Sequence, residues 1–81
     1  MLYKIPLVFS PQPEGGFTVT SPVLPELVTE GETVEDALAN VRDAFAAVVE
    51  AYQDLGRQLP PNLQFADANG PLWLETVVTS P

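Results

Sequence analysis

The sequence predicts an α+β domain with the element order β-β-β-α-β, in which one helix packs on a mostly antiparallel sheet. Three observations predict this fold class: apolar residues alternate near the start of the chain, they recur every three or four residues between positions 33 and 55, and Pro- and Gly-rich turns separate the segments. With 81 residues, 46% of them hydrophobic, the chain is expected to fold as one domain over residues 1–81.

The segments before the helix are typical of strands. In Leu2–Ser10 the apolar side chains alternate, which predicts a first strand, although Pro6 lacks an N–H and must face an edge, a gap or a bulge. A turn rich in Pro and Gly then leads into alternation at Phe17–Thr20, which predicts a hairpin. Glu26–Glu30 is short and β-prone, and we expect it to return antiparallel as a third strand.

The helix is predicted to begin after Thr33, whose hydroxyl can cap it, with Asp36 as the partner in a capping box. Gly56 favours an end near Leu55. The expected buried stripe is Val34, Ala37, Leu38, Val41, Phe45, Val48, Val49, Tyr52 and Leu55. The expected exposed face holds Glu35, Asp36, Asn40, Asp43, Glu50 and Asp54.

The segment after the helix contains a short apolar piece, Leu63–Phe65, and a turn or loop that ends at Pro71. Leu72–Thr79 is predicted to form the last strand. Because a strand reached through a helix usually returns by a right-handed crossover, we expect it to lie parallel to Leu2–Ser10.

A single helix covers one face of a four-stranded sheet, whereas the first and last predicted strands are apolar on both faces. A chain this short gains little stability from its own core, so we expect a homodimer or a stable hetero-complex that covers the second face. Trp73, flanked by Leu72 and Leu74, is the candidate anchor of that interface, with packing of Trp73 in the monomer core as the open alternative.

The charge balance limits the possible partners. Eleven acidic residues against three basic ones give a formal net charge of −8, which disfavours direct binding of nucleic acid or of anionic membranes. The acidity serves solubility or steers the chain toward a basic partner. No leader sequence is recognisable at Met1, so a cytoplasmic location is expected.

Catalytic and metal chemistry are not expected. The chain contains no cysteine and no histidine, which removes the usual ligands of zinc, haem and iron–sulfur centres and the base of Ser–His catalysis. The predicted first strand contains no carboxylate, and Gly15–Gly16 lacks the Lys of a phosphate-binding loop. We therefore expect no enzyme activity, no cofactor and no metal.

A combination of motifs resembles the HicB-like antitoxin family. The motifs are Glu14-Gly15-Gly16-Phe17-x-Val19, Pro22-x-Leu24-Pro25 and Thr29-x-Gly31-Glu32-Thr33-x-Glu35-Asp36-Ala37-Leu38-x-Asn40-Val41. The resemblance extends from about Leu2 to Pro60. It departs from the family pattern at Glu26, where Gly is frequent, and at Val28, where Cys is frequent.

The resemblance implies a partial ribonuclease-H-like fold and a protein that binds and blocks a small, basic, mRNA-cleaving toxin. Many members carry a C-terminal DNA-binding domain, which is not expected here because few residues follow the helix and none of them after Arg57 is basic. The alternative is a dimeric scaffold of the same fold without a toxin. Two surfaces qualify for partner binding: the sheet near Leu72, Trp73 and Leu74, and the helix face with Glu35, Asp36, Asp43 and Glu50.

Overall fold

The structure, a computed structural model, describes residues 2–61, 63–66, 69–71, 75–76 and 80. Within these residues it contains one helix and five short strands. In chain order the elements are β1 (Leu2–Lys4), β2 (Val8–Pro11), β3 (Phe17–Thr20), β4 (Val28–Gly31), α1 (Val34–Asp54) and β5 (Gln64–Ala66). The predicted α+β class with one helix is confirmed.

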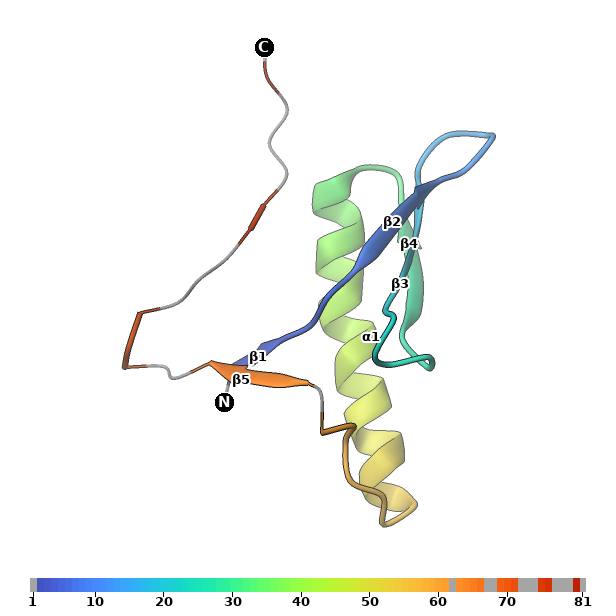
Figure 1. The fold of residues 1–81 in the computed structure, drawn as a ribbon. Coiled ribbons are helices and arrows are strands. Elements are labelled where there is room, and N and C mark those ends of the chain that lie inside the picture. Colours follow the sequence, from blue (N-terminus) through green and yellow to red (C-terminus); the bar gives the residue numbers. More distant parts are fainter. Residues whose placement is uncertain (1, 62, 67–68, 72–74, 77–79, 81) are drawn as a thin grey trace.

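The strands form two small antiparallel sheets. β2, β3 and β4 pair in that order, so the predicted hairpin and the antiparallel return of the third strand are confirmed. β1 pairs with β5, with Tyr3 opposite Phe65. Figure 1 shows β1 and β2 following one another along the same path, with α1 behind the three-stranded sheet.

The predicted single strand over Leu2–Ser10 is wrong, because the structure divides it into β1 and β2. Pro6 lies in the interruption between the two strands, which fits its inability to donate a ladder hydrogen bond. The alternation of side chains nevertheless continues across the break. Ile5, Leu7 and Phe9 all pack against the core cluster.

The helix begins as its capping residue predicts. The Thr33 hydroxyl accepts a hydrogen bond from the Asp36 backbone N–H at 3.1 Å, which satisfies one of the free donors of the first turn. At the other end Gly56 has a φ of 66°, the left-handed conformation that ends many helices. The helix therefore runs for 21 residues, one residue short of the predicted end.

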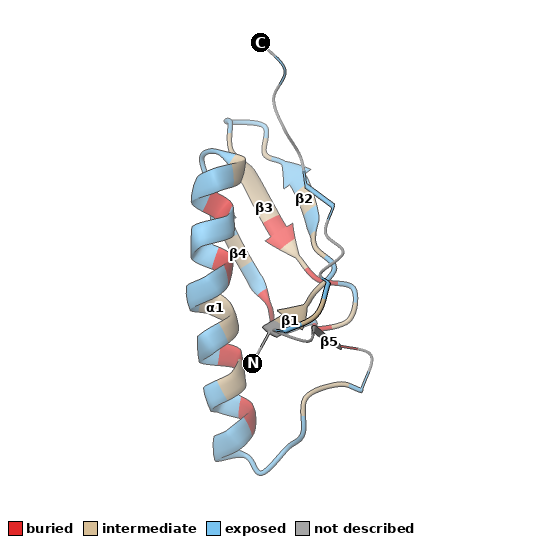
Figure 2. Ribbon diagram, turned by 90° about the vertical axis from the view of Figure 1, so that its left-hand side faces the viewer, coloured by how far each residue is buried: buried red, intermediate tan, exposed pale blue. Residues whose placement is uncertain are grey.

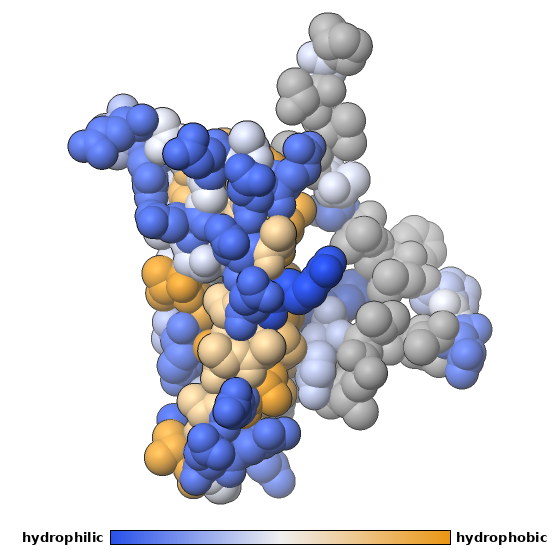
Figure 3. Space-filling view, turned by 180° about the vertical axis from the view of Figure 1, so that it is seen from behind, coloured by the Kyte–Doolittle hydropathy of each residue, from blue (hydrophilic) through white to orange (hydrophobic). Residues whose placement is uncertain are grey.

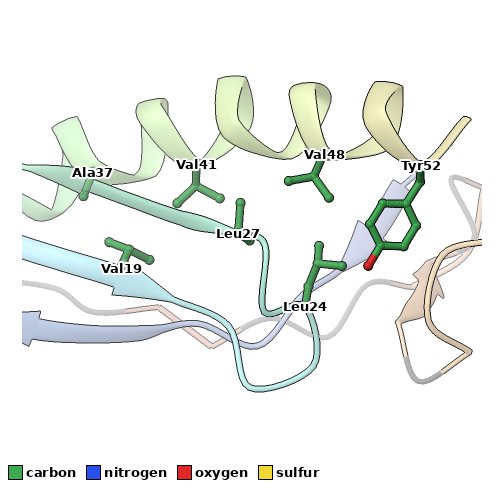
Figure 4. Packing of buried hydrophobic residues seen from close by; sticks show 7 residues of the cluster. All are labelled: Val19, Leu24, Leu27, Ala37, Val41, Val48 and Tyr52. Atoms are coloured by element: carbon green, nitrogen blue, oxygen red, sulfur yellow. The ribbon is translucent and has the colours of Figure 1, made fainter. Parts of the chain in front are cut away.

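The core lies between α1 and the three-stranded sheet (Figure 2). Val41 and Val48 of the helix point toward Leu24 and Leu27, and Ala37 points toward Val19 (Figure 4). Leu24 and Leu27 belong to the segment between β3 and β4, and both are fully buried. Leu24 of the Pro22-x-Leu24-Pro25 motif thus packs in the core beneath the helix, while the two prolines of the motif are exposed.

Three details of the predicted elements are corrected by the structure. Leu38 and Leu55 were expected in the buried stripe but are 44% and 69% exposed. Leu38 follows buried Ala37 by one position, which turns its side chain by about 100° away from the sheet, and Leu55 lies at the C-cap. The third strand begins at Val28 rather than at Glu26 and includes Gly31.

The predicted last strand, Leu72–Thr79, falls mainly on residues 72–74 and 77–79, which lie outside the described residues. Glu75 and Thr76 are described and belong to no strand. The strand that the structure does describe after the helix is β5, which the sequence analysis left as a short apolar piece. It runs antiparallel to β1. The parallel return was expected for Leu72–Thr79 and stays a prediction.

Glycines allow the helix and the hairpin to approach closely at one end of the sheet. A Cβ built on Gly31 would lie 2.6 Å from the Ala37 Cα, and one built on Gly16 would lie 2.8 Å from the Gly31 carbonyl oxygen. Both distances are far shorter than an ordinary van der Waals contact of about 3.5–4.0 Å. These two glycines therefore place the start of α1, the end of β4 and the β2–β3 turn side by side.

Candidate partner-binding surface

The structure places the predicted helix residues on the exposed side of α1. Glu35, Asp36, Asp43 and Glu50 are all exposed, as the sequence predicted. Leu72, Trp73 and Leu74, the other half of the predicted partner surface, lie outside the described residues. The helix face is therefore the part of the predicted site whose geometry can be described.

Three carboxylates form a line along α1. Asp36, Asp43 and Glu50 are seven residues apart, so consecutive members lie two helical turns and about 10.5 Å from one another on nearly the same side of the helix. The helix contains one basic residue, Arg42, and none in its last turn. A single attraction between exposed charges is weak in water, and the electrostatic fields of these three carboxylates add to one another.

A cleft of about 440 Å³ lies where this line begins, between the β2–β3 turn, the end of β4 and the first turns of α1. Its acidic lining residues are Glu30, Glu32 and Asp36, and Gly16 and Gly31 line it as well. Figure 3 looks onto the side of the molecule covered by α1, and hydrophilic side chains dominate its upper end, at the turn and the start of the helix. We call Glu30, Glu32, Asp36, Asp43 and Glu50 the acidic face.

Backbone geometry explains how α1 is attached to β4 beside this cleft. The Gln12 backbone N–H donates to the Gly16 carbonyl at 3.0 Å. The backbone N–H and C=O groups of even-numbered residues in β3 therefore point to β2, and those of odd-numbered residues point to β4. Glu30 pairs with Thr18 and therefore turns its carbonyl outward, away from β3. The Asn40 side-chain amide of α1 donates to that carbonyl at 2.7 Å, which fixes the helix to the free edge of β4.

Gln12 holds the carboxylate of Glu30 in place. Its side-chain amide donates to Glu30 Oε2 at 3.0 Å and to Thr18 Oγ1 at 2.8 Å. The three residues belong to the hairpin and to β4, and they lie at the end of the sheet next to the cleft. One carboxylate of the acidic face is thus ordered before any partner binds, which reduces the entropy lost on binding.

A second hollow, of about 390 Å³, lies at the other end of the helix, and its lining is largely apolar and uncharged apart from Arg57. The Arg57 guanidinium stacks over the Tyr52 ring, 4.6 Å from its centroid. The Tyr52 hydroxyl donates to the Glu26 carboxylate, which holds the pKa of Glu26 below and the pKa of Tyr52 above their ordinary values. This group joins the β3–β4 segment to the helix end, so we assign it a structural role.

Sequence reasoning missed two of the five residues of the acidic face. The sequence predicts only a strand end at Glu30, and Glu32 appears only within the family motif. The available signal was the density of acids around Gly31, since Glu30, Glu32, Glu35 and Asp36 fall within seven positions. What the sequence did not show is that Gly31 allows β4 and the helix to meet.

The described part of the chain lacks a metal-binding cluster and a membrane-spanning helix. No group of three or more Asp, Glu, His or Cys residues there is arranged to hold a metal ion. Likewise, no helix among the described residues is long and apolar enough to cross a membrane.

Comparison with known proteins identifies the class of this domain. No protein-family model matches the chain. It is 33% identical over 57 residues to the antitoxin HicB of Escherichia coli strain K12, and 35% identical over 57 residues to the antitoxin HicB 1 of Photorhabdus laumondii. Each match covers 70% of this chain. A protein of Thermoplasma acidophilum, UPF0150 protein Ta0767, is 28% identical over the same share of the chain.

These matches agree with the family resemblance of the motifs: 57 residues of the chain are homologous to HicB antitoxins. The matched region is 41% of the length of the Escherichia coli antitoxin and 37% of the Photorhabdus one. It is 83% of the Thermoplasma protein. The homologous segment is therefore a part of the longer antitoxins and most of a shorter relative.

Proposed function

We propose that this chain is an antitoxin domain that binds a small, basic, mRNA-cleaving toxin in the cytoplasm and blocks it by protein–protein contact. The homology to HicB antitoxins supports an antitoxin role, and the single structural observation that carries the mechanism is the acidic face. A toxin that handles RNA needs Lys and Arg side chains on its RNA-binding surface. A surface of five carboxylates around one cleft and one helix is complementary to it in charge.

In this proposal inhibition results from exclusion. The acidic face covers the basic surface of the toxin, so RNA and the antitoxin domain compete for the same cations. Attraction between opposite charges also raises the association rate, which suits a protein that must capture its partner before RNA is cleaved. The domain itself performs no catalytic step and needs no metal or cofactor. We also propose that residues 1–81 form a single domain and that this domain has a partial ribonuclease-H-like fold.

The proposal is tested by measuring toxin binding of charge-reversed variants. The probe is the small basic protein encoded next to this chain's gene, titrated calorimetrically. Asp43→Lys with Glu50→Lys should weaken binding about tenfold or more, since each reversal turns a modest attraction of about 0.2–1 kcal/mol into a repulsion. Glu14→Lys with Glu75→Lys changes the net charge equally at exposed positions outside the acidic face and should leave the affinity within about threefold.

Two outcomes contradict the proposal. If both pairs of substitutions weaken binding equally, the net charge and not the acidic face determines affinity. If the neighbouring gene encodes no small basic protein and none copurifies with the chain from its native cell, the antitoxin role itself fails. The second candidate function, a dimeric scaffold without a toxin, is favoured by a separate observation, the exposure of Val8 and Val28 on the sheet.

A further inference from the structure

A turn that follows β5 contains the one Asn-Gly pair of the chain. The sequence has three asparagines, and only Asn69 is followed by a glycine, Gly70. The structure describes residues 69–71, with Asn69 exposed in a turn and Gly70 half-buried. Figure 1 shows this segment standing away from α1 and from the three-stranded sheet. Water therefore reaches the Asn69 side chain.

An Asn-Gly pair in such a place loses its side-chain amide without an enzyme. The Gly70 backbone nitrogen gives up its proton to a base in the solvent and attacks the Asn69 Cγ, and the new bond closes a succinimide ring. The bond between Cγ and Nδ2 breaks, and the amide nitrogen takes up a proton and leaves as ammonia. Water then adds to one of the ring carbonyls and opens the ring. Water is the only co-reactant, and nothing is oxidised or reduced.

The glycine makes this attack possible. Without a Cβ at position 70, no side chain stands beside the attacking nitrogen, and the backbone rotates over a wider range than at any other residue. Among the described residues, no backbone carbonyl accepts a hydrogen bond from the Gly70 N–H. The nitrogen is therefore not held away from the Asn69 side chain by the ladder of a helix or a strand.

The other two asparagines lack these conditions. Asn40 lies within α1, and its side-chain amide is held by a backbone carbonyl of β4 at 2.7 Å. The next residue, Val41, is buried, and its N–H bonds to the carbonyl four residues earlier in the helix. Asn62 precedes Leu63, whose backbone N–H donates to the Pro60 carbonyl at 3.2 Å. In both cases the nitrogen is already in a hydrogen bond and belongs to a residue with a larger side chain.

We infer that Asn69 is a site of spontaneous deamidation, at which water converts the side-chain amide to a carboxylate with release of ammonia. The products are an aspartyl and an isoaspartyl residue at position 69. Either one adds a negative charge to the net charge of −8, because an Asp carboxyl has a pKa of about 3.9 and is ionised at neutral pH.

The isoaspartyl product also changes the covalent path of the chain. It inserts the side-chain methylene into the main chain between β5 and Pro71. Because the reaction needs only water, the share of modified chains rises with the time since synthesis. The inference does not rest on the proposed antitoxin function, since Asn69 is not part of the acidic face.

The experiment follows the purified 81-residue chain during incubation over days at several pH values. Trypsin cleaves after Arg42 and Arg57, so Asn40 and Asn69 fall in different peptides, and tandem mass spectrometry assigns each modified position. Amide loss at Asn69 should be at least about tenfold faster than at the other two asparagines, which corresponds to a barrier lower by about 1.4 kcal/mol. The rate should rise with pH, because the attacking nitrogen reacts without its proton.

Two variants in the same turn separate this mechanism from general hydrolysis. Gly70→Ala keeps Asn69 but adds a Cβ beside the attacking nitrogen, and it should slow the reaction about tenfold or more. The matched control is Pro71→Ala, at an exposed neighbouring position, which leaves the Asn-Gly pair intact and should change the rate by less than about threefold.

An enzymatic assay for isoaspartyl carboxylates identifies the product that only the succinimide route forms, and circular dichroism checks the fold of each variant. The inference predicts isoaspartyl residues at position 69 in the wild-type chain and in Pro71→Ala. A rate at Asn69 no higher than at Asn40, a rate that Gly70→Ala does not lower, or amide loss without an isoaspartyl product would each overturn the inference.

Discussion

Gly31→Ala tests the contact that builds the acidic cleft. A Cβ at position 31 would lie 2.6 Å from the Ala37 Cα and 2.9 Å from the Ala37 Cβ, about 1 Å inside an ordinary carbon–carbon contact. The nearest atoms belong to the helix backbone, so no side-chain rotation relieves the overlap. Overpacking of this kind costs about 1–3 kcal/mol, a large part of the roughly 4–12 kcal/mol expected for a domain of 81 residues.

The assay is thermal unfolding followed by circular dichroism. A loss of about 1–3 kcal/mol should lower the Tm by about 4–24 °C in a domain of this size. Adding Ala37→Gly should not rescue Gly31→Ala, because the backbone overlap remains and a glycine within a helix costs about 1 kcal/mol more. A Gly31→Ala variant within about 0.5 kcal/mol of the wild type would refute the argument that β4 and α1 meet through Gly31.

Two further predictions concern the core and the helix end. Leu24→Ala, at a fully buried position, should cost about 2–5 kcal/mol in denaturant unfolding, whereas Leu55→Ala should cost less than about 0.5 kcal/mol; similar losses would place Leu24 outside the core. The Glu26 carboxylate is favoured in the folded state, so Glu26→Gln should be less stable than wild type at neutral pH, and the difference should vanish as the pH falls below the ordinary pKa of 4.5 through the lowered folded-state pKa. A pH-independent difference would contradict the Tyr52 hydrogen bond as its cause.

Local signals in the sequence were sufficient for the helix and the hairpin. Thr33 and Gly56 mark the helix ends by their own chemistry, hydrogen bonding and left-handed backbone respectively. The break at Pro6 was foreseen only as one of several ways to accommodate a proline. The β1–β5 pairing was not foreseen, because three-residue strands carry too short a pattern and their pairing depends on contacts between distant parts of the chain.

The candidate site was predictable only in part for the same physical reason. Periodicity along one helix places Asp43 and Glu50 on its exposed side, and the structure confirms this exposure. The cleft requires Glu30 and Glu32 to lie beside Asp36, which follows from the tertiary approach at Gly31 and from the Asn40 bond to the Glu30 carbonyl. A sequence pattern records neither contact. The sheet surface around Trp73 stays a prediction.

The most direct test of the proposed antitoxin mechanism is an amide chemical-shift titration of the isotope-labelled chain with the small basic protein encoded beside its gene. The acidic face predicts the largest changes at Glu30, Glu32 and Asp36 and along the helix toward Glu50. The amides of Val8, Thr20 and Val28 should change little, because these residues form one row on the side of the sheet that α1 does not cover. Changes centred on Val8, Thr20 and Val28, with the acidic face unaffected, would contradict the account.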